Sequence, residues 1–275
     1  MYRRNSPSGR ESIASCNAAV ANRLFRLGGD NTQTALFWLS MKNPNRGKNS
    51  VKVSALLFDF GGTLAFLDFE LMAAEFSRPD RKLDPLKLEH AEYAGRAALD
   101  RHLMSEKTRD PNAAYEDFFR SWMDAAGIPE KEFADISARF RVLHAEACMW
   151  RIVRAGTHEA LDRLKSAGLK LGIVSNADGR VADDARRFGL AKYFDVIIDS
   201  HVVGVEKPHP KIFQLALDAL EVPPEEALYA GDIYSIDMLG ARAAGIEGKL
   251  IDQHGMYHWV EHPKIRHAGE LHIID

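Results

Sequence analysis

Four short apolar runs, each followed directly by polar residues, constrain the fold of this chain more than any other feature of its sequence. They cover residues 51–58, 169–174, 196–198 and 227–230. Each run has the length of a buried strand, and helix-compatible sequence follows, which predicts an α/β fold with a parallel sheet. The carboxyl ends of the strands in such an open sheet share one edge. The polar groups that follow the runs are therefore expected to meet in space.

The first of these polar groups is Asp59, which ends an apolar run and precedes Phe60, Gly61 and Gly62. An Asp at the carboxyl end of a parallel strand, followed by backbone flexible enough to wrap a ligand, is a candidate nucleophile or metal ligand. An Asp that caps the next segment would give the same local sequence. This stretch alone leaves both interpretations open.

The later polar groups add a consistent chemistry. Ser175 and Lys207 can donate to phosphate oxygens, and Asp59 with Asp232 can hold a hard divalent cation such as Mg²⁺ through oxygen. The metal and the lysine together can neutralise the charge that builds on a transferring phosphoryl group. Asp59 would then be placed to attack.

The ordered set of motifs resembles the haloacid dehalogenase (HAD) superfamily over residues 53–252. The resemblance implies a Rossmann-like parallel sheet core with an all-helical cap domain inserted after the first strand, Mg²⁺ dependence and an aspartyl-phosphate intermediate on Asp59. It implies catalytic roles for Asp59 and Lys207, and makes Asp237 an outer partner of Asp232 at the metal. The expected substrate-binding residues are Gly62, Thr63, Ser175, Asn176 and Lys207, and the expected metal-binding residues are Asp59, Gly61, Asp232 and Asp237.

One position departs from the family pattern. Phosphatases of the family carry a second Asp two residues after the nucleophile, which protonates the leaving group, and this chain has Gly61 there. General acid or base catalysis typically raises the rate about 10²- to 10⁴-fold, so its loss should lower the rate most for substrates with alkoxide leaving groups. The backbone carbonyl that this residue gives to the metal is retained. The cap histidines His90, His102 and His144 are candidates to replace the acid, although a surface or packed role is the simpler expectation for each.

Three functions remain open. A Mg²⁺-dependent phosphatase acting on a small phosphorylated metabolite is the leading one. The second is a HAD enzyme that cleaves a C–halogen bond or a C–P bond, the latter through a cap lysine such as Lys82, Lys87 or Lys107, each of which is expected at the surface. The third is a non-catalytic phosphate-binding regulatory module, and the joint presence of Asp59, Lys207 and Asp232 argues against it, because like charges crowded at one edge would otherwise only repel.

Residues 66–154 are predicted to form the helical cap, and residues 51–65 and 155–275 the HAD core. Asp84-Pro85 and Asp110-Pro111 each have the form of an N-cap followed by proline at the first helical position. The spacing of Leu86, Tyr93, Ala97 and Met104 predicts one apolar helix face, and Phe118 with Trp122 predicts another.

The first 50 residues are rich in Ser, Asn and Arg and lack sustained periodicity. They are predicted to be a disordered extension or, since Met41 lies shortly before the first strand, a stretch that precedes the true start, with a transit peptide as the alternative. No apolar stretch reaches the ~18 to 20 residues of a membrane span, and no secretory signal is evident. The formal net charge is −3, and the part after residue 50 is the acidic part, which argues against nucleic acid as the main partner. A cytoplasmic location is expected; the sequence leaves the oligomeric state open.

Overall fold

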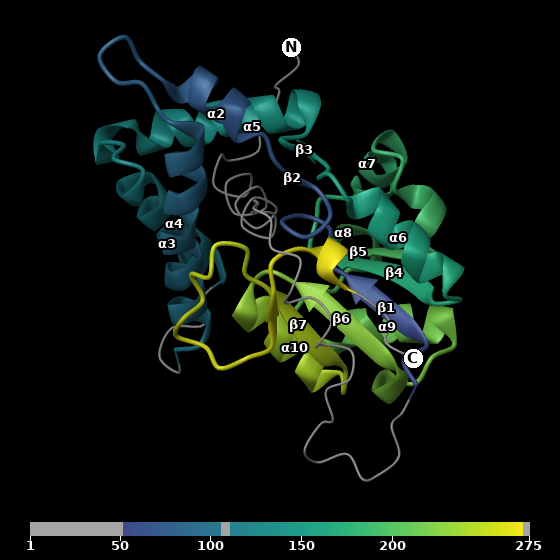
Figure 1. Cartoon of the computed structure of the whole chain (residues 1–275). Helices are drawn as coiled ribbons and strands as arrows, with labels where there is room; N and C mark the ends of the chain where they lie inside the picture. The colour runs from purple at the N-terminus through teal and green to yellow at the C-terminus, as the bar shows by residue number, and fades with distance from the viewer. Residues whose placement is uncertain (1–51, 106–110, 272–275) are drawn as a thin grey trace, which may run out of the picture.

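The computed structural model describes residues 52–105 and 111–271 and contains a six-stranded, fully parallel sheet, seen in the lower right part of the molecule (Figure 1). The strand order is β5-β4-β1-β6-β7-β8. The predicted parallel α/β fold is thereby confirmed. The strands are β1 (Ala55–Phe58), β4 (Lys170–Ser175), β5 (Val196–Asp199), β6 (Ala227–Gly231), β7 (Glu247–Ile251) and β8 (Lys264–Ile265).

Strand β1 lies between β4 and β6, and the register brings the polar groups to one edge. Phe58, the last residue of β1, pairs with Ile173 on one side and Ala230 on the other. The Asp59 amide then donates to the Ala230 carbonyl at 2.8 Å. The residues that follow all three strands therefore emerge side by side, as the sequence predicted.

Helices cover both faces of the sheet, because alternate strand residues point to opposite sides. Leu56 and Phe58 pack in one apolar cluster with residues of α6 and α7, whereas Ala55 and Leu57 pack in another with residues of α9 and α10. The helices and helical turns of the core are α6 (Thr157–Ser166), α7 (Val181–Arg187), η3 (Ala191–Tyr193), α8 (Ser200–Val203), α9 (Pro210–Leu220), η4 (Pro224–Glu226), η5 (Tyr234–Met238), α10 (Leu239–Ala243) and η6 (Ala268–Glu270).

The segment inserted after β1 is helical, with one addition that the sequence did not predict. Strands β2 (Phe66–Leu67) and β3 (Trp150–Ile152) pair antiparallel where the chain enters and leaves the insert. Strands of two and three residues are too short to show the alternation of apolar and polar residues that identifies a strand in a sequence. The helices of the insert are α2 (Phe69–Phe76), α3 (Pro85–Leu103), α4 (Pro111–Ala125), η2 (Glu130–Glu132) and α5 (Phe133–Ala147).

Helix α3 begins as predicted but buries a different face. The Asp84 side chain accepts from the amides of Leu86 and Lys87, which confirms the N-cap; the matching expectation for Asp110 lies outside the described residues. Leu86 and Met104 are 55% and 49% exposed, so the predicted apolar face is wrong at both ends. The buried face instead carries four charged side chains at helical spacing, at Glu89, Glu92, Arg96 and Asp100. Phe118 and Trp122 of α4 are fully buried, and their rings pack together, as expected.

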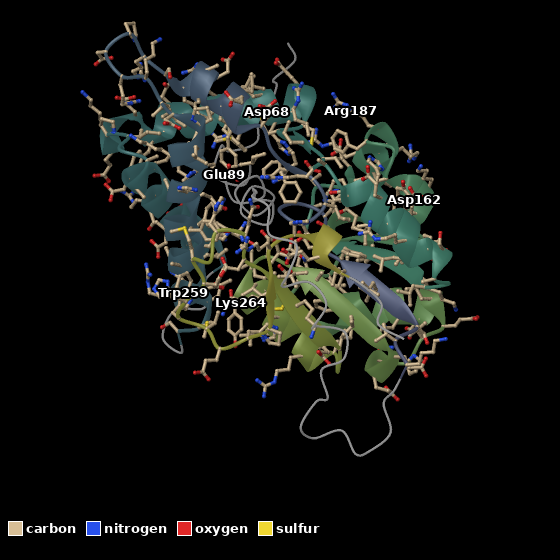
Figure 2. All side chains as sticks on the ribbon, viewed as in Figure 1. Asp68, Glu89, Asp162, Arg187, Trp259 and Lys264 are labelled. Atoms are coloured by element: carbon tan, nitrogen blue, oxygen red, sulfur yellow. The ribbon has the colours of Figure 1, made fainter. Side chains whose placement is uncertain are left out.

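The loop between β7 and β8 packs against the cap. The ring of Tyr93 on α3 lies edge-on to the rings of His254 and Tyr257 in this loop, with centroids 5.7 and 6.3 Å apart. Figure 2 shows Trp259 and Lys264 on the same yellow segment, beside the cap helices. Cap and core are thus held together both through α3 and through the C-terminal part of the chain. None of the helices within the described residues is long and apolar enough to cross a membrane.

Candidate active site

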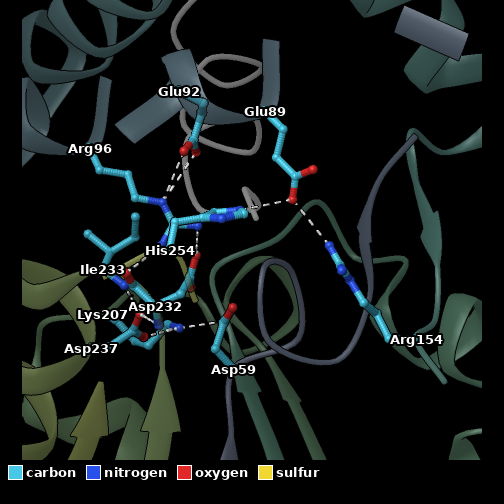
Figure 3. A network of polar contacts seen from close by, with 10 residues as sticks. All are labelled: Asp59, Glu89, Glu92, Arg96, Arg154, Lys207, Asp232, Ile233, Asp237 and His254. Atoms are coloured by element: carbon cyan, nitrogen blue, oxygen red, sulfur yellow. Dashed lines mark hydrogen bonds and ion pairs between the residues drawn. The ribbon is translucent and has the colours of Figure 1, made fainter. Parts of the chain in front are cut away.

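Asp59 and Lys207 form the centre of a buried polar cluster at the carboxyl edge of the sheet (Figure 3). The Lys207 Nζ donates to Asp59 Oδ1 at 2.6 Å, to Asp237 Oδ1 at 2.7 Å and to the Tyr229 hydroxyl at 2.9 Å. Asp59 has no exposed surface, and its burial raises its pKa to about 7, although the positive charge of Lys207 opposes the shift. The other carboxylate oxygen, Asp59 Oδ2, has no hydrogen-bond partner among the described residues.

Asp237 is turned toward the protein through both of its oxygens. Oδ1 accepts from Lys207 and from the Tyr229 hydroxyl, and Oδ2 accepts from the backbone amides of Asp232 and Ile233 at 3.0 and 2.9 Å. Asp237 therefore fixes the lysine and the backbone that carries Asp232. This geometry favours a supporting role, and its expected role as a direct metal ligand stays a prediction.

Tyr229 also belongs to this cluster, which its sequence context does not predict. Tyr229 lies within β6, and an aromatic residue in an apolar run is normally taken for a core residue. Only its hydroxyl group reaches the polar side chains at the end of the strand, 2.8 Å from Asp237 Oδ1. Gly231, two residues on, makes room for the same carboxylate: a Cβ there would lie 2.5 Å from Asp237 Cγ. A side chain at this position would push Asp237 away from Lys207.

Ser175 and Asn176 follow β4 but differ in what their side chains do. The Ser175 hydroxyl is buried without a hydrogen-bond partner in the part of the chain that the structure describes, so it is available to a ligand. Both ends of the Asn176 side-chain amide contact the backbone of Lys207: Nδ2 donates to its carbonyl at 2.9 Å, and Oδ1 accepts from its amide at 2.6 Å. Asn176 thus positions the lysine, and direct contact with substrate stays a prediction.

The loop that follows Asp59 folds back on itself. The Gly62 amide donates to the Ala65 carbonyl at 2.8 Å, and Gly62 has a φ of +72°, a conformation that favours glycine. The amide of Gly62 is therefore committed to the turn, which does not favour its expected role in substrate binding. The Thr63 hydroxyl is buried and lacks a hydrogen-bond partner among the residues described, like the Ser175 hydroxyl.

Asp232 contacts Arg96 of α3, a partner that the sequence does not predict. Arg96 Nη1 donates to the Asp232 carbonyl at 2.8 Å, and Nη2 lies 2.8 Å from Asp232 Oδ2 as an ion pair outside hydrogen-bond alignment. Arg96 Nε donates to Glu92 Oε2 at 3.1 Å, and all three side chains are fully buried. Burial raises the pKa values of Asp232 and Glu92 well above their ordinary range, while the charge of Arg96 opposes this.

These residues fit a hard divalent cation in two respects. Asp59 Oδ2 and Asp232 Oδ1 are buried carboxylate oxygens without a hydrogen-bond partner within the described residues, and oxygen is the donor that Mg²⁺ prefers. Asp59, Glu92, Asp232 and Asp237 together also carry more potential negative charge than Lys207 and Arg96 offset. No three His, Cys, Asp or Glu side chains in residues 52–105 and 111–271 form a ready metal cluster, so two carboxylates and backbone oxygen would have to suffice.

The cap histidines and lysines do not supply the group that Gly61 lacks. Both ring nitrogens of His144 are engaged: Nδ1 accepts from the Met149 amide at 3.2 Å, and Nε2 lies 3.3 Å from the Asp178 carboxylate, to which it can donate. His102 pairs with the exposed Asp117, and His90 is itself exposed. The lysines at 82 and 87 are exposed, as expected, and Lys107 lies outside the described residues.

A parallel α/β core, an inserted helical segment and a buried Asp–Lys–Asp cluster together define a HAD-type hydrolase. Residues 53–245 match the family described as haloacid dehalogenase-like hydrolase, and the chain belongs to this family.

Among curated proteins, haloacid dehalogenase-like hydrolase domain-containing protein 3 of Xenopus laevis is 39% identical over 126 residues, which is 46% of this chain and 49% of that protein. The human protein of the same name is 30% identical over 47% of this chain and 55% of its own length. Glyceraldehyde 3-phosphate phosphatase of Pyrococcus furiosus is 38% identical over 34% of this chain and 39% of that enzyme. The chain thus spans about half the length of the first of these relatives, and less of the phosphatase.

Two solved structures share the fold. A dehalogenase with an intermediate complex aligns with a TM-score of 0.54 at 17% identity, over 81% of this chain and 96% of that one. The HAD hydrolase YfnB of Bacillus subtilis, described as bound to magnesium, aligns with a TM-score of 0.53 at 21% identity, over 78% and 95%. At these identities the likeness concerns the fold alone.

Proposed function

We propose that the protein is a Mg²⁺-dependent phosphatase that acts on a small phosphorylated metabolite, with Asp59 as the nucleophile. The observation that carries this proposal is the state of the Asp59 carboxylate: Lys207 holds Oδ1 at 2.6 Å, while Oδ2 is buried at the strand edge without a hydrogen-bond partner among the described residues. With the carboxylate fixed by Lys207, one of its oxygens can attack phosphorus in line while the other faces the metal.

The side chains around Asp59 suit each part of that reaction. The hydroxyls of Ser175 and Thr63 can donate to the phosphoryl oxygens, and Lys207 offsets the negative charge that they carry. Attack by Asp59 forms a bond from its carboxylate to phosphorus and breaks the ester P–O bond, and the alkoxide that departs takes a proton from water. A water molecule then attacks the aspartyl-phosphate, which releases phosphate and restores the Asp59 carboxylate. Gly61 offers no proton to the departing oxygen, so acidic leaving groups should react fastest.

The carboxylates of Asp59 and Asp232 and the carbonyl of Gly61 would hold the Mg²⁺. When bound, the ion supplies a Lewis acid for the phosphoryl oxygens. Asp237 supports this set from behind through the Asp232 amide. A small-molecule substrate belongs to the same proposal, because Asp59 and Asp232 are fully buried among the described residues, where a macromolecule would not reach them. A cytoplasmic location is proposed with it.

Hydrolysis of p-nitrophenyl phosphate, whose leaving group is acidic, tests this function directly. The full chain, Asp59→Asn and the surface control Asp80→Asn would be assayed with Mg²⁺ and with EDTA. We expect turnover only with Mg²⁺, its loss in Asp59→Asn and its retention in Asp80→Asn. Absence of turnover in the native chain would overturn the phosphatase proposal. Halide release from a haloacid in EDTA would instead favour C–halogen cleavage.

A further inference from the structure

Arg154 is a buried arginine whose donors are largely unused. It lies two residues beyond β3, where the chain returns from the cap to the core, and its side chain is 8% exposed. Nη2 donates to Glu89 Oε1 at 3.2 Å, but Nε and Nη1 have no hydrogen-bond partner among the described residues. Burying charged donors without acceptors is costly, so this arrangement calls for a ligand.

Arg96 is a second buried arginine of the same protein, and each of its three side-chain nitrogens lies within 3.1 Å of a protein oxygen, two as hydrogen-bond donors and Nη2 as an ion pair. Its Nε contacts Glu92, and its Nη1 and Nη2 contact the carbonyl and carboxylate of Asp232, so every nitrogen has a protein partner. Within the part of the chain that the structure describes, Arg154 has such a partner at one nitrogen of three. This difference indicates that Arg154 has a role other than stabilising the fold.

The position of Arg154 places it beside the nucleophile loop. Its Cζ lies 5.2 Å from the ring centroid of Phe66, which begins the strand directly after that loop. Its partner Glu89 comes from cap helix α3 and also lies 3.4 Å from His254 Nε2. Figure 3 shows Arg154 reaching toward Glu89 on the cap side of Asp59. The free donors are therefore at the boundary where a substrate would be enclosed.

We propose that Arg154 binds a second anionic group of the substrate, remote from the phosphoryl group that Asp59 attacks. This inference rests on the proposed function. A guanidinium is the side chain best suited to a carboxylate or phosphate, because its planar donors pair with two oxygens at once. The substrate class is then a small organophosphate that carries a carboxylate or a second phosphate. Glu89 holds the arginine in place through Nη2 and leaves the other donors to the substrate.

Equilibrium binding to the full-length Asp59→Asn protein with Mg²⁺ tests this without turnover. The first probes are ω-phosphooxy carboxylates of increasing chain length, and calorimetry compares the affinity of each with that of its neutral amide. Alkanediol bisphosphates are the second set, and they test whether the remote anionic group is a phosphate and not a carboxylate. For at least one chain length, we expect the anionic probe to bind about 10- to 100-fold more tightly than its neutral match. Adding Arg154→Gln should remove this preference and leave amide binding within about twofold.

Two further variants make the result specific. Arg151→Gln, on the exposed Arg151 of β3 that pairs with Asp68 at 3.4 Å, should leave the preference unchanged. Arg154→Lys keeps the positive charge but lacks the planar donors of the guanidinium. The preference for the anionic probe over the neutral one should therefore fall by at least about fivefold. This variant replaces Arg154→Gln in the test if Arg154→Gln does not fold.

The inference is overturned if no anionic probe is preferred, or if Arg154→Gln weakens the anionic and neutral probes equally, since water or the fold alone would then account for the arginine. The p-nitrophenyl phosphate assay decides the proposed function separately. A preference that depends on Arg154 in a protein without phosphatase turnover would establish the anion site and reject the catalytic proposal.

Discussion

Arg96 of cap helix α3 makes an ion pair with Asp232 at the carboxyl edge of the sheet, with 2.8 Å between Nη2 and Oδ2 and no exposed surface on either side chain. Four residues along the same helix, Asp100 Oδ1 accepts from the Ser235 amide at 2.8 Å. The cap is therefore tied to the core at the residue that the proposed function assigns to Mg²⁺. Stability and metal binding should be coupled at this point.

Replacing Arg96 should destabilise the metal-free protein. Arg96→Gln would leave Glu92 and Asp232 buried without their cation, and removing one partner of a buried ion pair costs about 3–5 kcal/mol. Urea unfolding in EDTA would measure this loss. Arg101→Gln, at an exposed position of the same helix, should change the free energy of unfolding by less than about 0.5 kcal/mol. Equal stability of the two variants would show that the ion pair contributes nothing net.

The same substitution should strengthen Mg²⁺ binding. Arg96 offsets the charge of Asp232, so its loss leaves a more negative carboxylate for the cation, and we expect an affinity about 10-fold higher at low salt. Calorimetric titration of Arg96→Gln and of the native chain with Mg²⁺ would show the difference. Unchanged or weaker binding would mean that Arg96 does not oppose the cation at Asp232.

The buried Asp59 predicts a pH dependence of stability. Its pKa is raised from 3.8 to about 7 in the folded protein, so the folded state keeps a proton that the unfolded chain releases. The free energy of unfolding in EDTA should therefore fall as the pH rises from about 4 to about 7, by on the order of a few kcal/mol. Asp59→Asn lacks this proton equilibrium, so its stability relative to the native chain should increase with pH across that window. A stability difference independent of pH would contradict the raised pKa.

The positions of the main site residues could be predicted because their cause is local in sequence. Asp59, Ser175 and Asp232 each follow an apolar run, and the rule that parallel strands end at one edge is enough to bring them together. Lys207 is a lone cation in the same set, and the structure places it against Asp59.

The roles of the residues that position these site residues could not be predicted, because these roles depend on distances between separate helices and strands. Glu92 and Arg96 read as an ordinary solvated pair four residues apart on a helix. Only the docking of α3 on η5 makes them a buried part of the site.

Tyr229 should matter for activity more than for the fold. Tyr229→Phe removes a hydroxyl 2.8 Å from Asp237 and 2.9 Å from Lys207. We expect a loss of about 1 kcal/mol in stability and, because Lys207 keeps two carboxylates, a loss of up to about tenfold in turnover of p-nitrophenyl phosphate. Tyr193→Phe is the matched control, since the Tyr193 hydroxyl contacts Asp162 at 3.1 Å outside the site. It should cost similar stability and no activity; equal activity in both variants would remove Tyr229 from the site.

Restoring an acid at position 61 tests why this chain lacks one. Gly62 has a positive φ and Gly61 does not, so a side chain at 61 meets no left-handed backbone. If the absent acid limits turnover, Gly61→Asp should raise kcat for alkyl phosphates by up to about 10²- to 10⁴-fold and change that for p-nitrophenyl phosphate little, because only the alkoxide needs a proton. Gly61→Asn has nearly the same shape without the acid and should give no gain. A gain shared by both variants would point to substrate positioning, and a gain in neither would mean that the leaving group obtains its proton from another source.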